Sequence, residues 1–194
     1  MHVHYDSTAF VFGGVSLGEA NRYLTLFTKE LGLVSAVARS VRAEHSKLRP
    51  LLQELSEVDV TLVRGREVWR VTGAVLRRRL PETFKTEPER LKLAARLSLL
   101  LRRLLPGEER NPQLFDLYAD TIRHLENVPE ASLPELEQLA ALRMLGALGY
   151  RSRKGAFQVL LDSTDMEESM FAVMRKYRHE AVAELNELIN ASQL

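Results

Sequence analysis

The chain has 194 residues, of which 45% are hydrophobic, and its 27 Lys and Arg against 26 Asp and Glu leave a net charge of +1. This composition excludes an intrinsically disordered chain, and the length favours one hydrophobic core with a second, smaller one. No run of eighteen apolar residues and no signal-like start occurs, so we expect a cytoplasmic protein without membrane spans. The absence of cysteine excludes disulfides, thiolate catalysis and cysteine-ligated zinc.

Residues 1–80 predict an all-β first domain. Runs of β-branched and aromatic residues favour five strands, over residues 8–15, 21–31, 33–41, 57–63 and 67–76. In the fourth run Val58, Val60 and Leu62 alternate with polar residues, which predicts one inward and one outward face. Five strands in about 75 residues favour a barrel of the oligonucleotide-binding (OB) type, with an SH3-like barrel as the competing topology.

Glycines mark two of the predicted strand ends. Gly13-Gly14 is a strand-breaking pair that predicts the end of the first strand. Arg64-Gly65-Arg66 predicts a tight hairpin turn before the fifth strand, in which Gly65 can take a positive φ.

Positive charge gathers in the first domain, and most densely after the third predicted strand. Residues 1–80 hold twelve Lys and Arg against eight Asp and Glu, whereas residues 81–194 hold fifteen against eighteen. The first domain is therefore the candidate for a polyanionic partner, and a merely solvated basic surface is the alternative interpretation. The candidate phosphate contacts are Arg39, Arg42, Lys47, Arg49, Arg64 and Arg66.

The other notable residues of the first domain suggest structural roles. Arg77-Arg78-Arg79 predicts a linker, or salt bridges to the acidic helices that follow. The aromatic residues lie within apolar runs, so we expect them in the core and expect binding through the phosphate backbone without sequence specificity. These residues are Phe10, Phe12, Tyr23, Phe27 and Trp69.

From Thr86 the apolar period changes to that of helices, and residues 81–194 predict a second domain, a compact α-helical bundle. Helix-start signals and closing Pro or Gly residues predict helices over residues 88–105, 112–127 and 133–149, and a last one over residues 166–188. The segment 151–163 fits a short helix, a strand or a loop. The predicted fold class is thus α+β, with the barrel first.

The last helix carries methionines at helical spacing, namely Met166, Met170 and Met174. They most simply belong to the core. The second interpretation is a groove for an amphipathic tail, with Arg175, Lys176 and Arg178 beside it to meet acidic residues.

No arrangement typical of catalysis or metal binding occurs in the sequence. His2 and His4 most simply belong to an unmetallated terminus, and no nucleophile elbow, phosphate-binding loop or zinc-protease motif is present. We therefore predict no enzyme, no zinc and no other cofactor.

Several stretches resemble the RecO family of bacterial recombination mediators. Leu24 to Glu30, LTLFTKE, followed by Gly32, is similar to the second strand of that family. Ala38 to Arg42, ARSVR, and Ser46 to Arg49, SKLR, resemble its basic motif and the loop that follows. Leu139 to Tyr150, LAALRMLGALGY, resembles the helix that ends in Leu-Gly-Tyr.

The resemblance implies an OB barrel followed by a helical domain, and a nucleoid-associated protein of DNA repair. It implies binding of single- and double-stranded DNA and annealing of strands coated by single-stranded-DNA-binding protein (SSB). The implied partners are RecR and the acidic C-terminal tail of SSB, whose pocket would need an arginine rim. Candidates for that rim are Arg143, Arg175 and Arg178.

Two departures from the family leave other functions open. Many members carry a four-cysteine zinc module after the Leu-Gly-Tyr helix, which this chain lacks, and Ser40 stands where the family has Gly. A degenerate relative that serves as a protein-interaction adaptor with weak DNA binding is therefore the alternative. An RNA-binding barrel is the third function that the residues allow.

Overall fold

The computed structural model describes residues 3–39, 41, 46–150, 160–161, 166 and 168–191. The chain divides into two compact units. The barrel unit comprises residues 1–91 with residues 105–112, and the helical unit comprises residues 92–104 with residues 113–194. Within the described ranges, no helix is both long and apolar enough to cross a bilayer.

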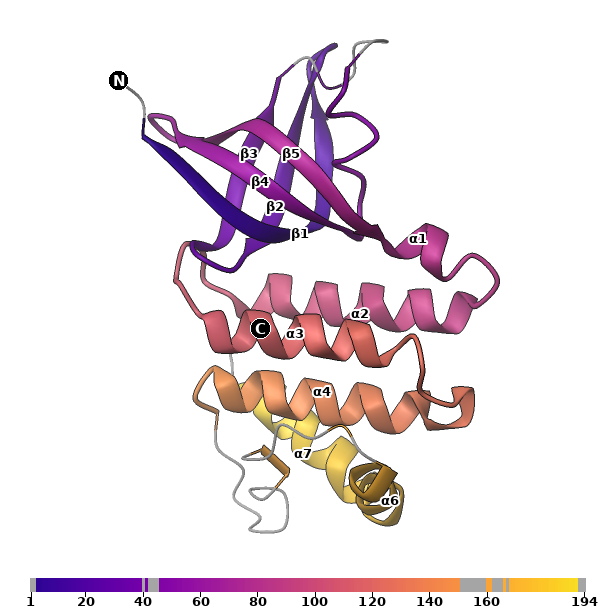
Figure 1. The fold of residues 1–194 in the computed structure, drawn as a ribbon. Coiled ribbons are helices and arrows are strands. Elements are labelled where there is room, and N and C mark those ends of the chain that lie inside the picture. Colours follow the sequence, from indigo (N-terminus) through magenta and orange to yellow (C-terminus); the bar gives the residue numbers. More distant parts are fainter. Residues whose placement is uncertain are drawn as a thin grey trace. The chain divides into compact units, whose positions relative to one another are not determined.

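Five strands close into a barrel (Figure 1). They are β1 (His4–Leu17), β2 (Asn21–Thr28), β3 (Gly32–Ala38), β4 (Ser56–Arg64) and β5 (Trp69–Arg79). The strand order is β1-β2-β3-β5-β4, in which β3 and β5 run parallel and every other pair is antiparallel. This is the OB-type barrel, so the SH3-like alternative is wrong and the predicted α+β class is confirmed.

Alternation along the strands fills the barrel with apolar side chains. Val58, Val60 and Leu62 are at most 2% exposed and lie in the core, as their spacing predicts. Leu24 and Leu26 of β2 lie in the same core, to which all five strands and the connecting residues Val41 and Leu52 contribute. The burial of these side chains is the main force that stabilises the barrel.

The first strand is longer than predicted, because Gly13-Gly14 does not end it. The register shifts between Val11 and Gly13, and pairing with β2 then continues to Leu17. A β-bulge lets a strand bend at such a point while it keeps its partner. The fifth strand also extends beyond its predicted end at residue 76, because it includes Arg77, Arg78 and Arg79.

The loop of residues 105–112 belongs to the barrel unit, although it connects two helices. The Leu33 N–H donates to the Gly107 carbonyl at 3.1 Å, and Arg110 forms an ion pair with Glu30 at 2.9 Å. Gly32 has φ +74°, and a Cβ atom there would lie 2.2 Å from the Glu109 carbonyl oxygen. Only glycine fits this contact between the β2–β3 turn and the loop.

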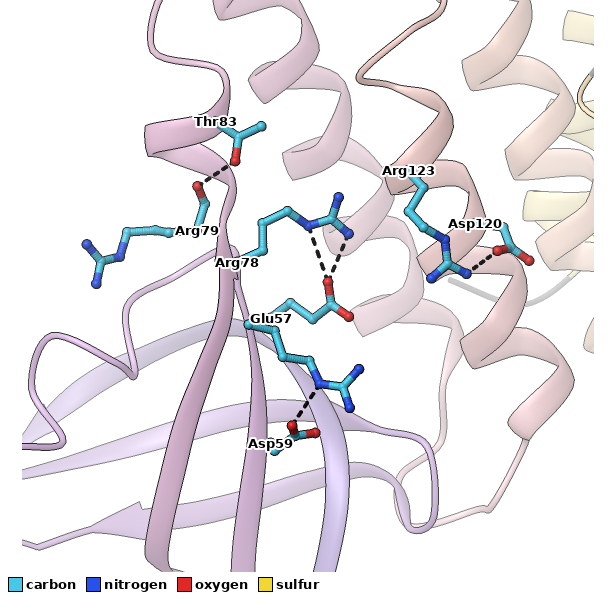
Figure 2. Close-up of polar contacts among 8 residues, drawn as sticks. Glu57, Asp59, Arg78, Arg79, Thr83, Asp120 and Arg123 are labelled. Carbon is cyan, nitrogen blue, oxygen red and sulfur yellow. Dashed lines mark hydrogen bonds and ion pairs between the residues drawn. The ribbon is translucent and has the colours of Figure 1, made fainter.

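The three consecutive arginines form ion pairs with the neighbouring strand β4 and with the short helix that follows β5. Arg77 contacts Asp59 at 2.8 Å, and Arg78 contacts Glu57 at 2.8 Å. Arg79 pairs with Glu82 in the short helix after β5, as predicted for this segment. The register places β5 beside β4, so the carboxylates of β4 are the nearest partners (Figure 2).

The helices of the chain begin directly after β5. They are α1 (Leu80–Thr83), α2 (Pro88–Leu104), α3 (Pro112–His124), η1 (Glu130–Ser132), α4 (Leu133–Ala147), α6 (Glu168–Lys176) and α7 (Arg178–Ala191). The short α1 and η1 were not predicted. The single last helix of the prediction is wrong, because the chain divides at Tyr177 and both α6 and α7 pack against α4 (Figure 1). Of the undecided segment 151–163, residues 160–161 are helical and the others lie outside the described residues.

We expect Gly32→Ala to lower the free energy of unfolding by more than about 2 kcal/mol, because it adds a clash with Glu109 to the cost of a positive φ. Gly18→Ala is the matched control, since Gly18 also has a positive φ, +61°, with nothing within 4 Å of its added Cβ. Urea unfolding of the two variants checks this. Equal losses of unfolding free energy in the two variants would show that the close contact between the loop and the β2–β3 turn does not restrict residue 32.

The hydrogen bond from Arg77, helped by one from Thr8, lowers the pKa of Asp59 despite partial desolvation. A lowered folded-state pKa stabilises the fold above the unfolded value of about 3.9, and this contribution disappears as the pH falls below it. We expect Asp59→Asn to cost at most about 1 kcal/mol at neutral pH, and nothing near pH 2.

Denaturant unfolding of Asp59→Asn between pH 2 and 7 measures this dependence. Glu67→Gln is the control, because Glu67 is exposed and pairs with no described residue. An identical pH profile for the two variants would contradict the role of the Asp59–Arg77 pair.

Candidate nucleic-acid interface

The barrel register brings two arginines to one depression on the outer surface. Arg70 pairs with Val37 of β3 and with Val63 of β4, and His4 of β1 pairs with Val63. Val63 is only 5% exposed and provides an apolar floor. The depression has a volume of about 240 Å³ and is lined by His4, Arg39, Val63, Arg70, Val71 and Thr72.

Both guanidinium groups of this depression are open to an anion. Arg39 is exposed, Arg70 is half-buried, and neither forms an ion pair with another described residue. A guanidinium group binds a phosphate through two parallel hydrogen bonds, so two of them can hold neighbouring phosphates. Arg70 was missing from the sequence candidates, although its place next to the buried Trp69 in an alternating strand indicates that it faces outward.

Lys47 and Arg49 lie on a turn that caps the barrel. Leu48 of this turn packs against the core, and its carbonyl accepts hydrogen bonds from the N–H groups of Leu51 and Leu52 at 3.1 Å each. Lys47 and Arg49 are both exposed, so they present charge from an anchored segment. Arg42 lies outside the described residues.

The two arginines of the β4–β5 turn differ in their surroundings. Arg64 lies 4.8 Å from the ring centroid of Trp69 and forms an ion pair with Glu108, so its charge is already engaged. Arg66 is exposed and pairs with no described residue. Gly65 does not have the positive φ that was predicted; a Cβ there would lie 2.3 Å from the Val68 carbonyl oxygen, so glycine is needed for space.

Acidic side chains gather on a different part of the barrel surface. Asp6, Glu30 and Asp59 line a depression of about 570 Å³, together with Lys29 and with hydroxyl groups such as that of Thr61. The Thr61 hydroxyl donates to Asp6 at 2.6 Å. Carboxylates repel phosphate, so this part of the surface is unsuited to a nucleic acid.

The three candidate rim arginines of the helical unit have structural partners. Arg143 is 3% exposed, and its Nε donates to the Leu160 carbonyl at 2.9 Å, so it does not line a surface. Arg178 contacts the buried carboxylate of Glu135 at 2.6 Å. Arg175 forms an ion pair with Glu168 of its own helix.

A pocket of about 500 Å³ lies in the helical unit. It is lined by Arg123, His124, Asn127, Val128, Pro129, Met166, Glu168 and Phe171. Val128, Met166 and Phe171 are at most 7% exposed and form apolar walls, whereas the polar residues lie at the rim. Met166, which precedes α6, therefore lines this pocket, while Met174 of α6 is fully buried.

The chain holds no cysteine, and within its described part no three His, Asp or Glu side chains gather in a way that could bind a metal ion. His2 lies outside the described residues.

Comparisons with known proteins match both halves of the chain. The family described as "Recombination protein O N terminal" matches residues 1–79, and "Recombination protein O C terminal" matches residues 85–153. Proteins named "DNA repair protein RecO" are similar over about three quarters of the chain.

Three of these relatives illustrate the level of similarity. The protein of Dehalococcoides mccartyi strain BAV1 is 32% identical over 76% of this chain and 57% of its own length. Those of Desulfitobacterium hafniense strain DCB-2 and Heliobacterium modesticaldum are 31% and 35% identical, over 77% and 75% of this chain and 53% and 52% of their own lengths. This chain thus spans just over half the length of the relatives that it matches. With the two family matches and the OB-type barrel, these similarities establish that the chain belongs to the RecO family.

Proposed function

We propose that this chain is a recombination mediator in DNA repair, which binds single- and double-stranded DNA without sequence specificity. In this proposal residues 1–80 form the DNA-binding domain and residues 81–194 the domain that docks other proteins. The observation that carries it is the pair of Arg39 and Arg70 at one depression of an OB barrel, neither paired with a described carboxylate. Membership of the RecO family supports the role in repair.

Binding would rest on the release of counterions from the phosphate backbone. Each phosphate contact from Arg39, Arg70, Lys47, Arg49 or Arg66 would free condensed cations, and affinity would fall steeply with salt. Arg42 belongs to the same set of proposed contacts, and Arg64 could join once Glu108 is displaced. Contacts to the backbone carry no sequence information, which accounts for binding without sequence specificity.

Annealing follows from the same electrostatics. Two strands held on one basic surface have their mutual repulsion screened, and pairing is downhill once they meet. The step needs no nucleotide hydrolysis, no cofactor and no catalytic residue. The reaction takes place where the bacterial chromosome lies, in the cytoplasm.

The proposed partners of the helical domain are RecR and the acidic tail of SSB. The pocket of the helical unit suits such a tail, because its walls are apolar and Arg123 stands at its rim. Arg175 lies beside the pocket through its ion pair with Glu168. Arg123 likewise forms an ion pair with Asp120 (Figure 2). The carboxylates of a bound tail would therefore replace Asp120 and Glu168 as the partners of these two arginines.

A protein-interaction adaptor with weak DNA binding is the second candidate function. The observation that favours it is the engagement of Arg64 by Glu108, which removes one cation from the surface. The two functions differ in the salt dependence of DNA binding.

We expect the double variant Arg39→Ala/Arg70→Ala to bind fluorescent single-stranded DNA more weakly, with a log–log salt slope shallower by about 1.4, since each lost phosphate contact removes about 0.7. The matched control is Arg77→Ala, because Arg77 contacts Asp59 near the acidic depression. A titration by fluorescence anisotropy at several salt concentrations measures both quantities. Unchanged binding by the double variant would show that Arg39 and Arg70 do not contact the phosphates. No binding of DNA by the native chain would favour the adaptor.

We expect Arg123→Ala/Arg175→Ala to weaken binding of a labelled SSB-tail peptide about tenfold, because two charge-assisted contacts to its carboxylates are lost. Arg96→Ala is the control in the same unit, since Arg96 pairs with Glu137 away from this pocket. Fluorescence polarisation gives both affinities. An equal loss in the control would place the tail elsewhere.

A further inference from the structure

A partly exposed tyrosine stands in the same cross-strand row as Arg70. Tyr23 of β2 pairs with Val15 of β1 on one side and with Val37 of β3 on the other, and Val37 pairs in turn with Arg70 of β5. Neighbouring strands are about 4.8 Å apart, so the backbones at Tyr23 and Arg70 are about 10 Å apart. One nucleotide can span that distance.

The strand pattern directs Tyr23 away from the core. Its neighbour Leu24 lies inside the barrel and is 0% exposed, and successive side chains of a strand point to opposite faces. Tyr23 is half-buried, whereas the other four aromatic residues predicted for the core are at most 4% exposed. The expectation that all five aromatic residues of the barrel are core residues is therefore wrong for Tyr23.

The surroundings of Tyr23 combine apolar surface with positive charge. Val15 is 66% exposed and Leu17 is 45% exposed, so apolar surface remains uncovered on the β1 side of Tyr23. The row through Tyr23 and its two neighbouring rows contain no Asp or Glu among their paired positions on β1, β2 and β3. Arg39 follows directly on β3.

These features select one kind of occupant. An apolar protein patch would cover the ring but leave the guanidinium groups without counter-charge. A phosphate ion alone would supply the counter-charge but leave the ring uncovered. A nucleotide meets both requirements, because its base stacks on an aromatic ring while its phosphates meet arginine.

We propose that Tyr23 stacks on a base of single-stranded DNA, with Val15 and Val37 at the edges of that base and its neighbouring phosphates at Arg39 and Arg70. This inference rests on the proposed DNA binding and adds the form of DNA that this face accepts. Bases of a duplex are already stacked on one another, so Tyr23 favours the unpaired strand.

The test compares three ligands: a thymine oligonucleotide, an abasic oligonucleotide of the same length and a duplex. Tyr23→Leu keeps an apolar side chain without the ring, and Tyr23→Phe keeps the ring. Val75→Ala is the matched control, since Val75 is equally exposed at 66% but lines the acidic depression.

We expect Tyr23→Leu to weaken binding of the thymine oligonucleotide about 5- to 30-fold, as loss of one base–aromatic stack does. Its affinities for the abasic strand and for the duplex should not change, and Tyr23→Phe and Val75→Ala should match the native chain on all three ligands.

Two results would overturn the inference. Equal weakening on the thymine and abasic strands would mean that Tyr23 acts through the fold or the phosphates, and unchanged binding of all three would mean that Tyr23 does not stack on a base. Both leave the proposed DNA binding intact, whereas a native chain that binds none of the three ligands refutes both proposals.

Discussion

Closure of the five-stranded barrel is the constraint on which the rest of the structure depends. The barrel closes through the parallel pair of β3 with β5 and the antiparallel pair of β1 with β4. Once these pairs form, alternate residues of each strand face the core and the others face outward. Burial of the inner set stabilises the barrel, and the same register fixes the outer rows. The neighbours of Arg70, namely Val37 and Val63, are thus a consequence of how the core is packed.

The outer rows divide charge unevenly. Asp6 and Asp59 stand on β1 and β4, where Arg77 and threonine hydroxyls neutralise or solvate them. Arg39 and Arg70 stand elsewhere, next to uncovered apolar side chains and without described carboxylate partners. A polyanion therefore meets a less favourable charge in the first region than in the second, so a barrel of small net charge can still orient a strand. Glu108 pairs with Arg64, so the charge of Arg64 is already engaged within the barrel unit.

Local pattern was enough to predict the strands and the barrel type, since alternation such as that of Val58, Val60 and Leu62 is a property of one segment. The surface was harder to predict, because it depends on pairing between distant segments. Arg70 reaches Arg39 only through the β3–β5 register, and Arg64 meets a glutamate 44 residues away. The apolar run around Tyr23 predicts a core residue. Only the placement of Leu24 inside the barrel shows that Tyr23 points outward. The division at Tyr177 likewise reflects packing on α4 rather than helix period.

The central claim is that the outer face of β2, β3 and the start of β5 receives the DNA strand. Backbone amide chemical shifts, recorded while a short single-stranded oligonucleotide is added, test this most directly. The account predicts that the largest shifts occur at Tyr23, Val37, Arg39 and Arg70, with little change at Asp6, Asp59 and Val75. Shifts concentrated around Asp59 and Val75, or confined to α3, α4 and α6, would contradict it.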